Sequence, residues 1–156
     1  MPVRIQTEDF DVSRELALLR GGNRAVGAVA AFIGTVRDVN DDARVASMTL
    51  EHYPGMTEKA LTVIVDAAKS RWDIIDALVI HRVGALAPSD QIVLVGVTSA
   101  HRGEAFSACE FIVDYLKTQA PFWKKEQTSA GARWVEARAT DDEAAARWAR
   151  TRDPAD

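Results

Sequence analysis

Two lysines that enclose a proline and two aromatic residues are the side chains of this sequence that most suggest chemistry. Lys117 and Lys124 flank Pro121, Phe122 and Trp123 within the segment YLKTQAPFWKKE. Large rings beside an ammonium group exclude water from it and lower its pKa, as nucleophilic and proton-transferring lysines require. A lysine in the last turn of a helix is also an ordinary partner of the helix dipole. The pattern alone therefore leaves a reactive pair and a structural pair both open.

A histidine and an arginine stand where a strand is expected to end and a helix to begin. His101 and Arg102 follow the apolar run at residues 91–98 and precede a helical pattern. Free backbone N–H groups and the helix dipole favour anions at such a junction, and an arginine binds a phosphate through two parallel hydrogen bonds. The alternative is a helix start whose polar residues only cap it.

Three more charged residues are weaker candidates. Arg37 ends the segment GTVR after an apolar run, but Asp38 beside it suggests a simple ion pair. Lys125 and Glu126 fit either the lysine site or a pair on the surface, and the surface pair is the default interpretation.

Other reactive residue types are assigned no chemistry. Cys109 lies on the apolar face of an expected helix, which favours a buried, inert thiol. His52 and His81 have no spacing to each other or to carboxylates that indicates a metal shell. The chain has no Walker-type loop, GxGxxG fingerprint or GxSxG elbow.

These residues must be positioned by the elements that the apolar pattern predicts. Helices are expected after Asp11 and Ser13, after Pro54 as far as Trp72, and from residue 103 to about Lys117, where Pro121 prevents continuation. Strands are expected at residues 3–7, 25–36 (as a buried strand), 45–53, 77–83 and 91–98, the last two as an antiparallel pair. Residues 38–44 read as a loop, the region after Phe122 as short and irregular apart from a small strand at 133–136, and residues 140–156 as a tail helix with a frayed end. This order predicts an α+β fold in which helices pack on a largely antiparallel sheet.

Composition limits the class of protein. A chain of 156 residues with 47% hydrophobic residues suits one compact domain, residues 1–156. The balance of 19 basic and 23 acidic residues, a net charge of −4, argues against a nucleic-acid binder with a broad basic surface. One cysteine forms no internal disulfide, so a reducing cytoplasm is expected. The longest apolar runs are far shorter than the roughly 20 residues of a membrane-spanning helix.

Five motifs then resemble one known family. LEHYPGMTEKAL, VIHRVG, VGVTSAHRGEAF, YLKTQAPFWKKE and RWVEAR occur in the order, and nearly at the spacing, of the large, catalytic subunit of molybdopterin synthase. The resemblance covers residues 26–148 and implies an α/β-hammerhead type of fold with a small β subdomain. It also implies a sulfurtransferase that converts cyclic pyranopterin monophosphate into molybdopterin, in molybdenum cofactor biosynthesis. The sulfur comes from a thiocarboxylate on the C-terminal Gly-Gly of a small ubiquitin-like subunit.

The resemblance also assigns roles to residues. It makes Lys117 and Lys124 the catalytic pair, with Phe32 and Phe122 lining the channel for the partner's tail. The substrate-binding set that it implies comprises both lysines together with Arg37, His101, Arg102, Lys125, Glu126 and Arg138. Thr35 replaces a lysine found in some members, and Lys125 an arginine. No metal and no cofactor are expected.

The assembly that the resemblance implies is a homodimer within a heterotetramer, with one small subunit at each end. The small apolar segment at residues 26–33 suits an interface strand and a buried interior strand equally well. A non-catalytic module that binds a ubiquitin-like tail or a pterin phosphate is the alternative from another functional class. A generic phosphate-ester enzyme is less favoured, because the sequence suggests neither a metal shell nor a base beside the phosphate.

Overall fold

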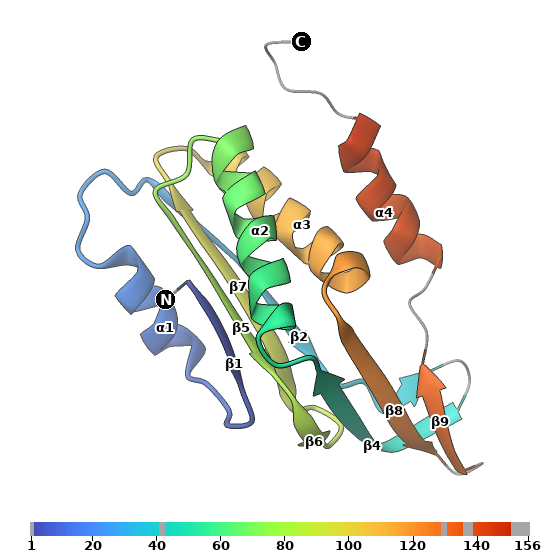
Figure 1. The fold of residues 1–156 in the computed structure, drawn as a ribbon. Coiled ribbons are helices and arrows are strands. Elements are labelled where there is room, and N and C mark those ends of the chain that lie inside the picture. Colours follow the sequence, from blue (N-terminus) through green and yellow to red (C-terminus); the bar gives the residue numbers. More distant parts are fainter. Residues whose placement is uncertain (1, 41–42, 129–130, 136–138, 151–156) are drawn as a thin grey trace.

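The computed structural model describes residues 2–40, 43–128, 131–135 and 139–150 (Figure 1). In chain order its elements are β1 (Val3–Gln6), α1 (Val12–Arg20), β2 (Ala28–Thr35), β3 (Val39–Asn40), β4 (Ala43–His52), α2 (Met56–Arg71), β5 (Asp76–Arg82), β6 (Gly84–Leu86), β7 (Gln91–Ser99), α3 (Arg102–Gln119), β8 (Phe122–Thr128), β9 (Gly131–Val135) and α4 (Ala139–Arg150). Among the described residues, no helix is both long and apolar enough to cross a membrane.

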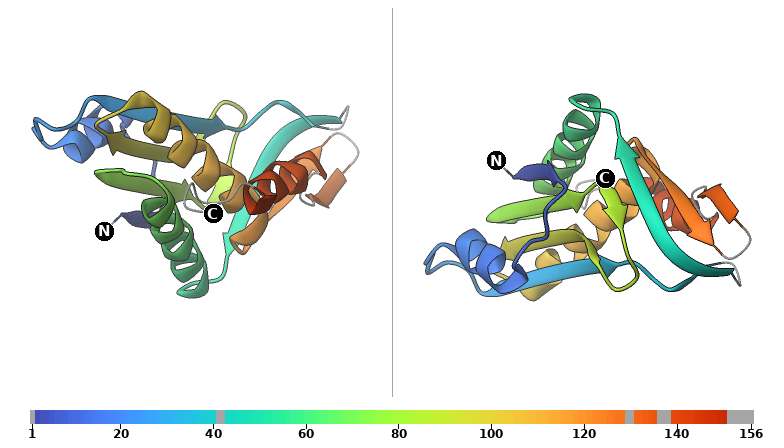
Figure 2. Two further views of the ribbon diagram at one scale, coloured as in Figure 1. Left: turned by 90° about the horizontal axis from the view of Figure 1, so that it is seen from above. Right: turned by 90° about the horizontal axis from the view of Figure 1, so that it is seen from below.

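The first sheet has the strand order β1-β5-β7-β2, in which only the β1–β5 pair is parallel. Helices α2 and α3 cover one face and α1 packs on the other (Figures 1 and 2). Side chains alternate along β5, so this strand contributes apolar residues to both faces of the sheet. Ala77 and Val79 enter the main core under α2 and α3, whereas Leu78 and Ile80 enter a smaller core under α1.

The second sheet is antiparallel throughout, with the order β3-β4-β8-β9 and with β6 also paired to β4. Its apolar core consists of Val36, Met48, Leu50, Val83 and Leu86. Three half-buried side chains pack against this core and the main core alike, namely Ile5, Ile92 and Phe122. They form the seam between the two sheets.

Helix α4 packs against the main core, although the sequence predicted only a tail helix with a frayed end. Trp148 is 8% exposed and makes edge contacts with Trp72 and Phe111. Its indole Nε1 donates to Asp114 Oδ2 at 2.6 Å, which fixes α4 against α3.

The sequence predictions of an α+β class, a largely antiparallel sheet and an antiparallel β5–β7 pair are confirmed. The loop predicted at residues 38–44 is wrong, because β3 pairs antiparallel with the start of β4 there. The irregular region predicted after Phe122 is also wrong, because β8 is a seven-residue strand between β4 and β9. Its charged sequence hid it, since strands are recognised mainly by apolar alternation.

Two further segments differ from expectation. Strand β2 was predicted to be buried, but in a single chain it is an edge strand whose outer residues Val29 and Ile33 are each 39% exposed. No strand was predicted between residues 83 and 91, yet Gly84–Leu86 is the short strand β6. The division of the chain into one domain stays a prediction.

Candidate functional site

Helix α3 and the proline after it fix the place of Lys117. The helix ends at Gln119, and Ala120 is extended (φ −83°, ψ 135°). The residue before a proline is disfavoured in helical geometry, and Pro121 has no N–H to continue the ladder. Lys117 therefore lies in the last turn of α3, where its side chain is exposed.

Strand β8 places Lys124. Its first residue, Phe122, pairs with His52 of β4, and Lys124 pairs with Leu50. Because side chains alternate along a strand, Lys124 points to the same side as Phe122, toward the seam between the sheets. Lys124 is half-buried.

A buried histidine packs against the segment that joins the two lysines. His81, on β5, is 5% exposed and stacks on Phe122, with ring centroids 3.9 Å apart and an interplanar angle of 17°. Its Nδ1 is 2.8 Å from the carbonyl oxygen of its neighbour Arg82. A carbonyl oxygen only accepts, so Nδ1 bears the proton and Nε2 the lone pair.

The pKa of His81 reflects its burial and the charges near it. Burial is the main reason that its pKa falls from 6.5 to about 4. Lys117, Lys124 and His52 lower the pKa further, because each repels a proton on the ring. Ammonium groups from two different elements therefore lie near enough to this imidazole to lower its pKa.

A threonine of α2 holds the turn that joins the lysines. Thr57 is fully buried, and its hydroxyl donates to the carbonyl oxygen of Pro121 at 3.0 Å. The hydroxyl oxygen of Thr57 also accepts from the backbone N–H of Tyr53 at 2.9 Å. Both hydrogen-bonding roles of the hydroxyl are thus used inside the protein.

Arg37 lies at the same end of the first sheet as these residues. Strand β2 ends at Thr35, which pairs with Gln91 at the start of β7. Val36 then donates to the carbonyl of Asp90 at 2.9 Å, which anchors the backbone just before the exposed Arg37. Phe32, on the same strand, is half-buried against the main core.

His101 and Arg102 lie elsewhere. They are exposed at the N-terminus of α3, where the Ser99 hydroxyl accepts from the backbone N–H of His101 at 3.2 Å. At 1.5 Å of rise per residue, Arg102 is about 22 Å along the helix from Lys117. One chain therefore does not bring the His-Arg pair to the lysine pair.

Three predicted residues lie partly or wholly outside what is described. The backbones of Lys125 and Glu126 lie in β8, but their side chains are outside the described part of the chain. Arg138 is outside the described residues altogether. The assignments of all three stay predictions.

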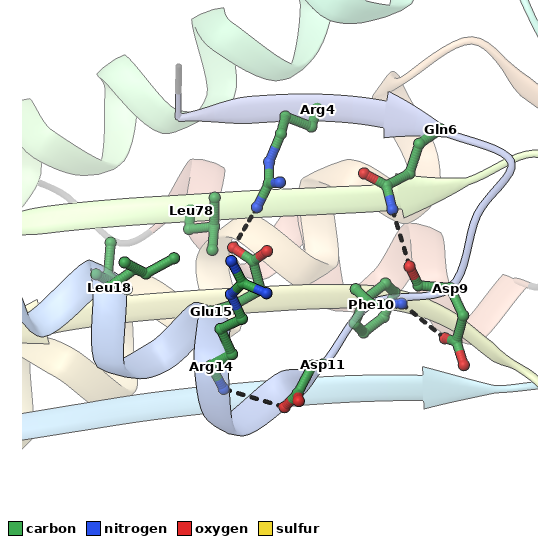
Figure 3. Close-up of a pocket in the computed structure, with 10 residues that line it drawn as sticks. Arg4, Gln6, Asp9, Phe10, Asp11, Arg14, Glu15, Leu18 and Leu78 are labelled. Atoms are coloured by element: carbon green, nitrogen blue, oxygen red, sulfur yellow. Dashed lines mark hydrogen bonds and ion pairs between the residues drawn. The ribbon is translucent and has the colours of Figure 1, made fainter.

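A separate hollow of about 760 Å³ lies among β1, α1 and β5 (Figure 3). Arg4 pairs with Glu15 across it, and Asp11 caps α1 at its edge. None of the predicted site residues lines this hollow.

Sequence reasoning missed Thr57 and set His81 aside, although each left a signal. His81 follows Ala77 and Val79 at a spacing of two, so its position on the buried face could be read from the strand pattern. Thr57 stands four residues before Leu61 and shares the buried face of α2.

Known proteins resemble this chain in sequence and in fold. A family model described as MoaE protein matches residues 5–119. A molybdopterin synthase catalytic subunit of Ralstonia nicotianae is 70% identical over 94% of this chain and 83% of its own length. The solved structure of a molybdopterin biosynthesis MoaE protein from Burkholderia ambifaria is 58% identical, covers 96% of this chain and 98% of that chain, and has a TM-score of 0.81.

A more distant solved chain has the same fold. It comes from a complex of subunits 1 and 2 of molybdopterin-converting factor from Helicobacter pylori. It is 18% identical, covers 88% of this chain and 92% of that chain, and has a TM-score of 0.72. At this identity the likeness concerns the fold alone.

Proposed function

Because the chain belongs to the MoaE family, the catalytic subunits of molybdopterin synthase, we propose that Lys117 and Lys124 form its reactive centre. The chain is a sulfur-transferring enzyme of molybdenum cofactor biosynthesis. The substrate that we assign is cyclic pyranopterin monophosphate. The sulfur donor that we assign is the C-terminal thiocarboxylate of a small ubiquitin-like subunit.

The observation that supports this assignment is that both lysines flank one anchored turn and that both lie near enough to His81 to lower its pKa. A phosphorylated pterin and a thiocarboxylate tail are both anions, so bringing them together costs electrostatic repulsion. Two ammonium groups at one seam offset that repulsion, and more strongly once the bound partner excludes water.

The two lysines divide the work in this proposal. Lys117, exposed at the end of α3, is free to contact the pterin and to polarise, protonate or bond covalently to its reacting centre. Lys124, half-buried on β8, steers the thiocarboxylate. Phe122 and Phe32 line the approach of the glycine tail, whose lack of side chains permits deep insertion.

The phosphate ligands that we propose come from both ends of α3. Arg37 lies at the lysine end of the first sheet. His101 and Arg102 are about 22 Å away along the helix, so they reach a lysine pocket only when a second copy of the chain supplies them. Lys125, Glu126 and Arg138 remain in the proposed substrate-binding set.

We therefore also propose a homodimer that carries a small subunit at each end. The exposed apolar residues Val29 and Ile33 on the edge strand β2 support contact between copies. The solved complex of subunits 1 and 2 of molybdopterin-converting factor from Helicobacter pylori supports a small partner subunit. The one cysteine, Cys109, is free and buried, which fits the reducing cytoplasm that we propose as the location.

The test measures sulfur transfer from a purified thiocarboxylated partner. Wild type should consume the thiocarboxylate only when the pterin precursor is present, and Lys117→Ala should fold and bind the partner but form no molybdopterin. Lys69→Ala, at the far end of α2, is the matched control and should retain activity. Near-normal product formation by Lys117→Ala would refute the assignment.

A further inference from the structure

The turn between the two lysines is held by residues that lie outside it. The Thr57 hydroxyl donates to the carbonyl oxygen of Pro121 at 3.0 Å. This is a contact between residues that are 64 apart in sequence, and it links the first turn of α2 to the turn after α3.

The next residue of the turn is held from another direction. The His81 ring stacks on Phe122 at 3.9 Å between centroids. The ring cannot rotate freely, because Nδ1 donates to the carbonyl of Arg82 and the side chain is 5% exposed. Thr57 and His81 thus fix two consecutive residues, Pro121 and Phe122.

These contacts matter because the two lysines belong to parts of the fold built on different sheets. Lys117 is on a helix that packs on the first sheet, whereas Lys124 is on a strand of the second sheet. The turn at residues 120–122 is the covalent connection between them. Its conformation sets how the two ammonium groups face each other.

We propose that Thr57 and His81 are positioning residues for sulfur transfer. By fixing the turn at residues 120–122, they keep Lys117 and Lys124 in a defined position relative to each other. This inference rests on the proposed function of the lysine pair. Both residues act through the turn and need not touch either reactant.

Direct proton transfer by His81 is the competing role, and the site disfavours it. Burial and the charges of Lys117, Lys124 and His52 hold its pKa at about 4, whereas an ordinary lysine ammonium has a pKa near 10. The neutral ring is therefore a poor base toward either lysine. The stacking of its ring on Phe122 is therefore the contact through which His81 acts.

The first test removes only the hydroxyl of Thr57. Thr57→Val preserves shape, and Thr57→Ser keeps the donor and acceptor. Thr62→Val is the matched control. The Thr62 hydroxyl donates to the backbone carbonyl of Glu58 on the exposed side of α2 and does not contact the turn. Each variant is assayed for kcat and KM with thiocarboxylated partner and pterin, and for affinity toward the unmodified partner.

We expect Thr57→Val to lose about tenfold to a hundredfold in kcat, the cost of misplacing reacting groups by about an ångström. Partner affinity should stay within about twofold, and Thr57→Ser should recover most of kcat. Wild-type kcat in folded Thr57→Val, or an equal loss in Thr62→Val, would overturn the inference.

The second test uses His81 and is decisive even where Thr57→Val does not fold. His81→Phe keeps a flat ring against Phe122, whereas His81→Leu removes it. A positioning role predicts that the phenylalanine variant retains most of kcat and the leucine variant loses it. An equal loss of kcat in both variants would show that the imidazole itself is needed. Full activity in both would show that the stacking on Phe122 is not needed.

Lys117→Ala, measured beside these variants, distinguishes the proposed function of the lysines from the positioning role of Thr57 and His81. An active Lys117→Ala refutes the proposed function of the lysines. An inactive Lys117→Ala together with fully active Thr57→Val and His81→Leu leaves that function intact and refutes only the positioning role.

Discussion

His81 should make the stability of the protein fall in mild acid, and replacing it with phenylalanine should reduce that fall. The unfolded chain has an ordinary histidine pKa of 6.5, whereas in the folded protein burial lowers the pKa of His81 to about 4. Between these values the unfolded state binds a proton that the folded state excludes. The free energy of unfolding therefore decreases as the pH falls through this window.

The size of the effect follows from the same two values. At about 1.36 kcal/mol for each pKa unit, the gap between 6.5 and about 4 corresponds to about 3 kcal/mol. The full contribution is present above pH 6.5, and it is lost by about pH 4. The groups whose charges act on the ring come from three elements, namely Lys117 of α3, Lys124 of β8 and His52 of β4.

Urea unfolding of wild type and His81→Phe, at one protein concentration and between about pH 7 and about pH 4, measures this difference. His81→Phe shifts stability at every pH, because the carbonyl of Arg82 loses its donor. Only the change of the free energy of unfolding with pH tests the role of His81, since the carboxylates titrate equally in both proteins. Parallel curves for the two proteins would refute it.

Three further predictions concern the rest of the fold. Cys109, whose pKa burial raises to about 11, should resist iodoacetamide in the native protein at about pH 8 and react after unfolding in guanidinium; rapid native labelling would contradict this. Trp148→Ala should cost about 3 to 5 kcal/mol in chemical denaturation by removing the contacts of α4 with Trp72 and Phe111, and a loss below about 1 kcal/mol would mean that α4 is not docked in solution. Asp11→Ala should cost about 1 kcal/mol, because the side chain caps α1 at Arg14 N, whereas Asp11→Ser should cost much less.

The helices and the central strands could be predicted because their apolar residues recur at a regular spacing. Leu61, Ile64, Val65 and Ala68 mark α2, and the run at Gln91–Ser99 marks β7. Strand β8 could not be found in this way. Its residues FWKKEQT lack apolar alternation, and its existence depends on pairing with β4 and β9, which are remote in sequence or follow it.

The lysine pair could be selected from sequence, but its surroundings could not. Pro121 and Phe122 indicated that Lys117 and Lys124 belong together. The contacts that join them, from Thr57 and from His81, connect residues that no local pattern relates. The separation of His101 from Lys117 follows from helix geometry, and the shared motifs concealed it because they preserve order along the chain and not distance in space.

Helix α3 joins the His101–Arg102 end of the molecule to the Lys117 end without a break. A single inserted residue inside it would advance everything that follows by about 1.5 Å and rotate it by about 100° around the helix axis. If the residue were inserted before Ile112, Ile112 and Leu116 would leave the main core and Lys117 would point in a different direction. Changes of length inside α3 are therefore not tolerated in this enzyme, because the rotation of the helix about its axis fixes the direction of the lysine at its end.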